Sequence, residues 1–420
     1  MEKGLTMNFM HKLSTQVNTH LSTNLITKLS TSLTIPRRLS AFFSATKFLL
    51  ACSLLAGSVQ AQIIPATTIF PASDAMYACY RIPAVVTLKD GSILAFAEGR
   101  PAGCADSGNI QIVMRRSVDG GATWSAISVV ARNGTNTAGN AVPVVDLLDP
   151  LYPNGRVFLF YNTGNSTESN VRNGIGIREQ QVITSIDGGL TWSAPNNISA
   201  QTAKLGAAPY NNPANWRALA MGPGHGLQLA DGRIVIPGNY TAGPPQANWA
   251  DNRAYAFYTT DHGATYQIGG DTGYPGSNES TAAQLSNGAV MINSRNQSGF
   301  TKNRLVSLSN DGGQSFSYGT PNTDLIDPIC EGSLLNIMWN GKPYLIFSNP
   351  ASTSGRHHLT IKGSKDNGST WPFGLLITAG TSAYSDLTQL DANNLGIVYE
   401  NGSNGIRFMK VPIARVITAP

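Results

Sequence analysis

Short apolar stretches separated by glycine-containing turns make up the chain from residue 82 onward. In the first unit, residues 82–88 lead into the turn Asp90-Gly91, and a second apolar stretch follows at residues 93–98. After a polar loop, residues 110–116 form a third stretch. Runs of this length bounded by turn residues are typical of β-strands, and no long helical pattern accompanies them. The pattern predicts antiparallel strands joined by tight turns.

The same unit recurs along the chain. Glycine turns precede apolar strands at four later places, namely Asn154-Gly155 before residues 156–161, Asp231-Gly232 before 233–237, Asn287-Gly288 before 289–294, and Asn340-Gly341 before 342–348. A last pair of strands is expected at residues 395–400 and 406–411. Repetition of one supersecondary unit indicates a repeat architecture.

A motif of the form Ser-x-Asp-x-Gly-x-Thr-Trp follows the third strand of five units. Its copies lie at residues 117–124, 185–192, 259–266, 309–316 and 364–371. Asp and Gly favour a tight turn through local hydrogen bonds and positive φ, and the final aromatic side chain is expected to pack into the sheet below. We interpret the motif as structural.

Six units in residues 62–420 give about 60 residues each, the length of a four-stranded propeller blade. We therefore predict an all-β, single-domain, six-bladed β-propeller over residues 62–420, in which residues 67–70 close the last blade.

Strand direction places several polar residues on one face of this propeller. The glycine turns and the five motifs share a face, because the strands that lead into them run in the same direction. The opposite face carries seven candidate residues: Arg81, Asp106, Glu279, Arg295, Arg356, Tyr384 and Glu400. Polar groups that converge at the mouth of a propeller indicate a binding or catalytic site.

Residues 1–61 differ in composition from the rest. They carry six basic residues against the single acid Glu2, and an apolar run at residues 48–57 precedes the small-residue sequence Val59-Gln60-Ala61. We interpret them as a secretory signal peptide, which predicts a secreted or periplasmic mature chain. A membrane anchor is the weaker alternative, because the run is shorter than the roughly 18 residues of a spanning helix.

The formal charge of +5 belongs to this leader, since the remaining chain has as many acidic as basic residues. We therefore expect no nucleic-acid partner and no anionic-membrane partner. No His or Cys cluster has metal-ligand spacing, and no phosphate loop or dinucleotide fingerprint occurs, so no metal and no cofactor are expected. We expect a monomer.

Three arginines on the predicted face point to an anionic ligand. Guanidinium groups that lie close together repel one another unless an anion is their partner, and their planar fork suits a carboxylate. The three are Arg81 in Tyr-Arg-Ile-Pro, Arg295 in Asn-Ser-Arg-Asn and Arg356 in Ser-Gly-Arg-His.

With Glu98-Gly99-Arg100, Asp106 and the five repeated motifs, this order resembles the catalytic domain of bacterial-type sialidases (neuraminidases) over about residues 65–412. The repeated motifs resemble the Asp-boxes of that family. The resemblance implies an exo-alpha-sialidase, a glycoside hydrolase that acts on sialylated glycoproteins, glycolipids or oligosaccharides.

The resemblance also implies roles for the candidate residues. Arg81, Arg295 and Arg356 would hold the carboxylate of sialic acid. Tyr384, in Ala-Tyr-Ser-Asp-Leu, would be the nucleophile and Glu279 its base, since sialidases are a known exception to the use of two carboxylates. Ala383 stands where the family commonly has glycine.

The remaining roles are proton transfer to the leaving group and the positioning of other site residues. Asp106 would be the general acid in a retaining mechanism with a covalent sialyl-tyrosine intermediate. Arg100 would contact the substrate or orient Asp106, and Glu400, in Tyr-Glu-Asn-Gly, would hold the fork of Arg81.

One alternative function, a trans-sialidase, stays open, and two others are weaker. A trans-sialidase, transferring to another sugar or to a hydroxyl of the substrate itself, would use the same residues, and Tyr161, Tyr240 and Trp249 could then stack an acceptor or merely pack. A sialic-acid-binding propeller without catalysis would keep the arginines. A two-carboxylate glycosidase using Asp106 and Glu279 would leave the arginines and Tyr384 without a role.

Three cysteines remain outside the leader: Cys79, Cys104 and Cys330. We favour a Cys79–Cys104 disulfide, because each lies two residues before a candidate site residue and an exported protein meets oxidising conditions. Three buried thiols are the alternative.

Overall fold

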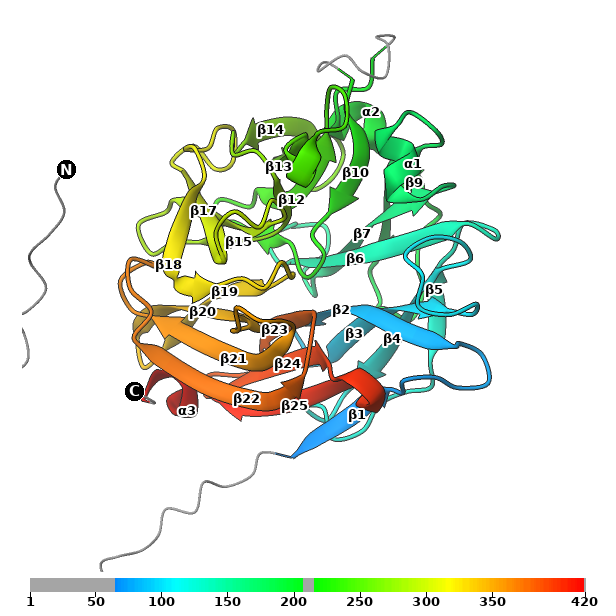
Figure 1. Ribbon diagram of the computed structural model, residues 1–420. Helices are drawn as coiled ribbons and strands as arrows, with labels where there is room; N and C mark the ends of the chain where they lie inside the picture. Colours follow the sequence, from blue (N-terminus) through cyan, green and yellow to red (C-terminus); the bar gives the residue numbers. More distant parts are fainter. Residues whose placement is uncertain (1–64, 207–214, 419–420) are drawn as a thin grey trace, which may run out of the picture. The chain divides into compact units, whose positions relative to one another are not determined.

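Six antiparallel β-sheets follow one another around a central axis in the computed structural model, which describes residues 65–206 and 215–418 (Figure 1). Each sheet is one blade, and blades I to VI are numbered in chain order. The predicted leader, residues 1–61, lies outside the described residues. The prediction of an all-β six-bladed propeller is confirmed.

Blades I to III are formed by consecutive strands. Blade I contains β2 (Cys79–Thr87), β3 (Ile93–Arg100), β4 (Gln111–Ser117) and β5 (Ser128–Ala131). Blade II contains β6 (Thr137–Asp146), β7 (Arg156–Gly164), β8 (Arg178–Ser185) and β9 (Asn196–Asn197). Blade III contains β10 (Arg217–Met221), β11 (Leu227–Gln228), β12 (Ile234–Thr241), β13 (Asn252–Thr259) and β14 (Gln267–Asp271).

Blades IV and V repeat this order, and blade VI closes the ring. Blade IV contains β15 (Ser277–Gln284), β16 (Val290–Asn296), β17 (Asn303–Ser309) and β18 (Thr320–Ile326). Blade V contains β19 (Ser333–Trp339), β20 (Lys342–Pro350), β21 (His357–Ser364) and β22 (Phe373–Thr381). Blade VI contains β23 (Ser385–Gln389), β24 (Asn394–Glu400), β25 (Ile406–Pro412) and β1 (Ala66–Phe70).

Strand β1 comes from the start of the described chain, yet it completes the last blade. It pairs with β25 in a register that places Thr67 opposite Phe408. The prediction that residues 67–70 close the last blade is therefore confirmed, and the ring is held shut by backbone hydrogen bonds between distant parts of the chain.

Helices are few and short in the described ranges. They are α1 (Glu168–Arg172), α2 (Ser199–Thr202), α3 (Ile413–Ile417) and the 3₁₀ turns η1 (Ala247–Trp249) and η2 (Gly402–Asn404). Among residues 65–206 and 215–418, no helix is long and apolar enough to cross a membrane.

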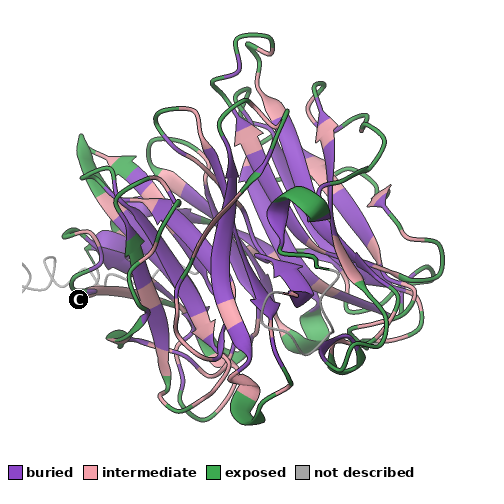
Figure 2. Ribbon diagram, turned by 90° about the horizontal axis from the view of Figure 1, so that it is seen from above, coloured by how far each residue is buried: buried purple, intermediate pink, exposed green. Residues whose placement is uncertain are grey.

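Buried apolar side chains gather between neighbouring blades. Between blades I and II, for example, Phe96 and Ile112 share a cluster with Leu159, and each of the three is fully buried. Figure 2 shows that the strands are mostly buried while the exposed residues lie in the connecting loops. Packing of one blade against the next thus supplies the core.

The five repeated motifs form turns of one geometry. In the first copy, the Oγ of Ser117 donates to Asp119 and accepts the backbone N–H of Gly121 at 2.8 Å, and Asp119 also accepts the Thr123 hydroxyl at 2.6 Å. Gly121 has φ of 92°, and a Cβ at this position would overlap the ring of Phe408. The last residue, Trp124, packs edge-on against Phe408 of blade VI. The structural interpretation of the motif is supported, and the turns also join neighbouring blades.

The first strands of blades I to IV share an irregularity near one end. Their registers shift at residues 81–84, 139–142, 217–220 and 277–280. Within three of these bulges a non-glycine residue has positive φ: Ile82 (57°), Asn140 (56°) and Ala218 (43°). Bulges re-aim side chains at the rims of sheets, and the first and last of these four carry Arg81 and Glu279.

Candidate active site

One pocket collects the predicted site residues on the face away from the Asp-boxes. Seven of them line it: Arg81, Arg100, Asp106, Glu279, Arg295, Arg356 and Tyr384. The eighth, Glu400, lies behind Arg81. A separate hollow is lined by the turns at Asp90 and Gly155 together with Asp187 of an Asp-box, as expected if these share the other face.

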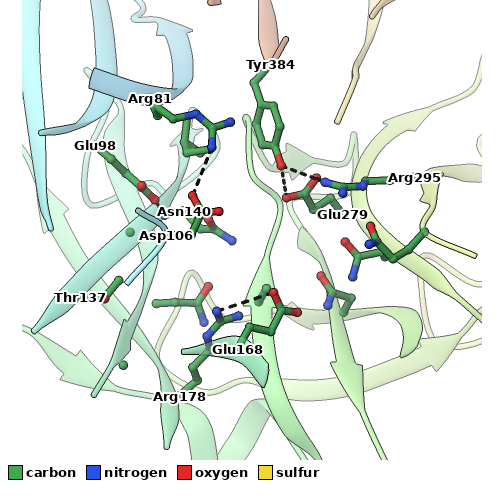
Figure 3. Close-up of a pocket in the computed structure, with 18 of the residues that line it drawn as sticks. Arg81, Glu98, Asp106, Thr137, Asn140, Glu168, Arg178, Glu279, Arg295 and Tyr384 are labelled. Atoms are coloured by element: carbon green, nitrogen blue, oxygen red, sulfur yellow. Dashed lines mark hydrogen bonds and ion pairs between the residues drawn. The ribbon is translucent and has the colours of Figure 1, made fainter. Parts of the chain in front are cut away.

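Tyr384 points into this pocket between Arg81 on one side and Glu279 with Arg295 on the other (Figure 3). It directly precedes β23, and its hydroxyl donates to Oε1 of Glu279 at 2.5 Å. The NH1 group of Arg295 donates to the same hydroxyl at 3.0 Å and to Oε2 of Glu279 at 2.6 Å. A phenol, a carboxylate and a guanidinium therefore form one closed hydrogen-bonded triangle.

Two further arginines flank the ring of Tyr384. The Cζ atoms of Arg81 and Arg356 lie 5.2 and 5.6 Å from its centroid. Arg356 also donates to the carbonyl oxygen of Ile329 at 2.9 Å. The three arginines, which come from blades I, IV and V, thus surround one side chain and present guanidinium groups to the same space.

Burial and the charge of Glu279 raise the pKa of Tyr384 well above its ordinary value, although Arg295 and Arg81 act in the opposite direction. The phenol is therefore neutral. Its proton can leave only as it passes to Glu279, to which it is already hydrogen-bonded.

Arg81 is fixed by Glu400 at the end of β24. Its Nε and NH2 groups lie 3.2 and 3.4 Å from the two oxygens of Glu400. Oε1 of Glu400 also accepts the backbone N–H of Ile82 at 2.8 Å. Glu400 thus holds both the guanidinium and the bulged backbone beside it.

Asp106 lies across the pocket in the loop between β3 and β4, with its side chain 73% exposed. Its Oδ1 accepts NH1 of Arg100 at 2.7 Å and NH1 of Arg81 at 3.2 Å. Burial acts to raise the pKa of Asp106, but the charges of Arg100 and Arg81 outweigh it, so the pKa lies below its ordinary value. Asp106 is therefore a carboxylate at neutral pH.

A disulfide anchors the loop that carries Asp106. Cys79 in β2 and Cys104 in the loop are bonded, with their Cα atoms 5.3 Å apart, and Cys330 is free and buried. The favoured pairing is confirmed, and the alternative of three buried thiols is wrong. The bond ties the segment bearing Arg81 to the segment bearing Asp106.

We expect Cys104→Ser to lower the free energy of unfolding by about 3 kcal/mol, because the bond closes a loop of 25 residues in the unfolded chain. Urea unfolding of the oxidised wild type and the variant measures the difference. Wild type unfolded in the presence of a reductant is the control and should match the variant. Equal stability of oxidised and reduced wild type would contradict the expectation.

Several further polar residues line the pocket and were not predicted as part of the site. They include Glu98, Asn140, Glu168, Arg178 and Asn239. Glu168 and Arg178 face each other across 3.9 Å at the wall furthest from Tyr384 in Figure 3. A sequence signal existed for Glu98, since it precedes Arg100 by two residues and therefore shares a strand face with it.

The three aromatic residues proposed as acceptor contacts have different positions. Tyr161 is buried between blades I and II, and Tyr240 is stacked on Trp216 at 3.6 Å between ring centroids. Only Trp249 of the three lines the pocket, where its ring packs on the guanidinium of Arg172. Tyr161 and Tyr240 therefore pack in the interior and do not contribute to the pocket wall.

One group of potential metal ligands occurs in the described part of the chain, outside this pocket. It comprises Asp146, Asp149 and His262. Arg156 pairs with Asp149 at 2.9 Å, and His262 contacts Asp146 at 2.8 Å. With a guanidinium already neutralising the carboxylates, the group serves as a polar link between blades II and III rather than as a cation site.

Comparison with known proteins finds a matching family and similar sequences. A family profile described as a BNR repeat-like domain matches residues 91–398. A sialidase of Micromonospora viridifaciens is 32% identical over 90% of this chain and 60% of its own length. An exo-alpha-sialidase of Aspergillus fumigatus is 30% identical over 68% of each chain. This chain therefore spans about three fifths of the first relative and two thirds of the second.

Solved structures share the fold. A Hadza microbial sialidase, Hz136, superposes with a TM-score of 0.73 and 28% identity, over 84% of this chain and 69% of that one. An intramolecular trans-sialidase from Ruminococcus gnavus, crystallised with oseltamivir carboxylate, gives a TM-score of 0.67 at 18% identity, over 84% of this chain and 98% of that one. The second likeness concerns the fold alone.

Proposed function

Since the chain belongs to the sialidase family, we propose that it is an exo-alpha-sialidase that releases terminal α-linked sialic acids from glycoproteins, glycolipids or oligosaccharides. The observation that carries this proposal is the hydrogen-bonded triangle of Tyr384, Glu279 and Arg295 beside two more arginines. Three guanidinium groups fit a substrate that bears a carboxylate, and a neutral phenol can approach such a substrate without charge repulsion.

In the first step, the substrate carboxylate binds Arg81, Arg295 and Arg356. Asp106 gives a proton to the glycosidic oxygen as the bond from that oxygen to the anomeric carbon breaks. The oxygen of Tyr384 forms a bond to the same carbon, while Glu279 accepts the phenolic proton. Arg295, already donating to the Tyr384 hydroxyl, stabilises the negative charge that develops there.

In the second step, water enters where the aglycone left. Asp106, now a carboxylate, takes a proton from this water as its oxygen bonds to the anomeric carbon. The bond to Tyr384 breaks, and Glu279 returns the proton to the phenolate. Two displacements at one carbon release sialic acid with retention of configuration.

The resting charge of Asp106 gives this mechanism a pH signature. A general acid must carry a proton, yet Arg100 and Arg81 lower the pKa of Asp106 in the free enzyme. A substrate carboxylate that engages Arg81 draws one of these charges away, so the pKa of Asp106 rises on binding. We expect the alkaline limb of kcat to lie at higher pH than that of kcat/KM, because the two report the complex and the free enzyme. Profiles with α-sialyl-lactose test this; coincident limbs would contradict it.

We further propose export across a membrane, with residues 1–61 removed. The Cys79–Cys104 disulfide supports this, since such bonds persist in oxidising compartments. N-terminal sequencing of the protein recovered from culture fluid or periplasm should begin at Gln62. A cytosolic protein that keeps the leader would contradict export. Size-exclusion chromatography of the mature chain tests the expected monomer.

The direct test of the activity is incubation of purified mature protein with α-sialyl-lactose, followed by identification of the products. Free sialic acid supports the proposal. A sialylated second sugar, or an internally linked anhydro sugar, would indicate transfer instead. Binding of sialic acid by a folded protein that releases nothing would indicate a binding propeller.

A further inference from the structure

Glu98 is a buried carboxylate in the pocket wall that the mechanism above does not use. It lies near the end of β3, and its side chain is 4% exposed. Both of its oxygens are occupied. Oε2 accepts Nε and NH2 of Arg100 at 2.9 and 2.5 Å, and Oε1 accepts the backbone N–H of Asn140 at 2.8 Å.

The contact of Glu98 with Arg100 connects Glu98 to Asp106. Arg100 is only 3% exposed, and a guanidinium so deeply buried needs a counter-charge. Glu98 supplies this charge and fixes two of the nitrogens. The remaining nitrogen, NH1, is thereby aimed at Oδ1 of Asp106 (2.7 Å) and at the carbonyl oxygens of Cys104 (2.6 Å) and Ala105 (3.1 Å). Asp106 is mostly exposed, so its position depends on this contact, on the contact with Arg81 and on the disulfide at Cys104.

The second contact crosses to blade II. Asn140 lies in the bulge of β6 with φ of 56°, and it lines the pocket near Asp106 (Figure 3). The residue before it is Gly139, where a Cβ would stand 2.3 Å from Oε1 of Glu98. The backbone of blade II therefore approaches Glu98 as closely as glycine alone permits. One carboxylate joins the loop of Asp106 to the neighbouring wall of the pocket.

We infer that Glu98 is a positioning residue for leaving-group protonation, which fixes the Asp106 carboxyl through Arg100 and the adjacent pocket wall through the backbone of Asn140. The inference rests on the proposed function, since it takes Asp106 to be the general acid. Without the charge of Glu98, Arg100 would be neutralised by Asp106 alone. The charge of Arg100, no longer shared with Glu98, would lower the pKa of Asp106 further and keep the acid deprotonated.

The test uses Glu98→Gln and two kinds of substrate. A glutamine fills the same space, but it carries no charge and its amide cannot accept from both Arg100 and Asn140. An α-sialyl-lactose needs its leaving oxygen protonated, whereas an aryl α-sialoside with an acidic phenol does not. We expect Glu98→Gln to lower kcat/KM for sialyl-lactose by about 100-fold and for the activated aryl sialoside by no more than about threefold. Its alkaline limb on sialyl-lactose should also move to lower pH.

Two further variants make the outcome decisive. Asp106→Ala should lose more kcat/KM on sialyl-lactose than on the aryl sialoside, by a larger ratio than Glu98→Gln does. If it loses equally on both, Asp106 is not the general acid. If Asp106→Ala shows the larger loss on sialyl-lactose, and Glu98→Gln reduces activity on both substrates equally, the inference about Glu98 is overturned while the proposed function stands. Asp146→Asn, which removes a buried carboxylate outside the pocket, is the matched control. Any change in kcat/KM that it causes should be equal on the two substrates.

If Glu98→Gln does not fold, Arg100→Lys carries the test. Lysine keeps the charge, but it has no fork with which to bridge Glu98 and Asp106. We expect the same selective loss on sialyl-lactose. An equal loss on both substrates would overturn the inference.

Discussion

Tyr384→Phe is expected to lower kcat by about 1,000-fold or more while leaving the affinity for sialic acid nearly unchanged. The variant keeps the ring between Arg81 and Arg356 and loses only the hydroxyl. That oxygen is the proposed nucleophile, and phenylalanine has no oxygen that could bond to the anomeric carbon. Steady-state kinetics with an aryl α-sialoside and calorimetric binding of sialic acid measure the two effects.

Tyr240→Phe is the matched control for this variant. Tyr240 is also buried, and its hydroxyl donates to a carboxylate, Asp271, at 2.9 Å, but it does not line the pocket. We expect this control to lose about 1 kcal/mol of stability and to keep its activity. Full activity of Tyr384→Phe, or an equal loss of activity in both variants, would remove Tyr384 from the mechanism.

Glu279→Gln is expected to lower kcat by about 100- to 10,000-fold at the optimum of the wild type, because the phenolic proton loses its acceptor. The residual activity should rise with pH. In the wild type, burial and the charge of Glu279 raise the pKa of Tyr384, while Arg295 and Arg81 lower it. Glutamine removes the raising charge and leaves the two arginines, so Tyr384 ionises at a lower pH in the variant than in the wild type.

The measurement is a pH profile of kcat with an activated aryl α-sialoside, for which protonation by Asp106 matters little. The control is Glu179→Gln, in which the replaced carboxylate contacts Asn197 outside the pocket. A profile of Glu279→Gln that falls in parallel with that of the wild type at alkaline pH would show that Glu279 is not the base.

Much of the fold could be predicted because each blade repeats one local pattern. Turn residues such as Asp90-Gly91 and the five Asp-boxes mark strand ends by local chemistry, which sequence displays directly. Except in blade VI, the second strands extend beyond their predicted ends, however. Strand β7 reaches Gly164 and β12 reaches Thr241 rather than stopping at residues 161 and 237. The added residues include Asn162, Thr163 and Asn239, which line the pocket and are polar, so the apolar pattern ends before the strand does.

The site was predicted in part, for a related reason. Residues such as Arg81, Glu279 and Tyr384 occur in recognisable motifs and lie on one face by strand direction. Glu98 accepts a hydrogen bond from the backbone of Asn140 across two blades, and the approach of Gly139 to Glu98 depends on how the blades pack. The same holds for Tyr161 and Tyr240, whose burial follows from neighbouring sheets. Sequence alone does not display such contacts.

The most direct test of the central claim is a ¹H NMR time course of α-sialyl-lactose with purified protein, in which the α and β anomers of sialic acid are resolved. We expect release of sialic acid, first as the α-anomer and only later as the β-anomer by spontaneous mutarotation. Tyr384→Phe should release none on the same time scale. No release by the folded wild type, or the β-anomer as the first product, would contradict the proposed mechanism.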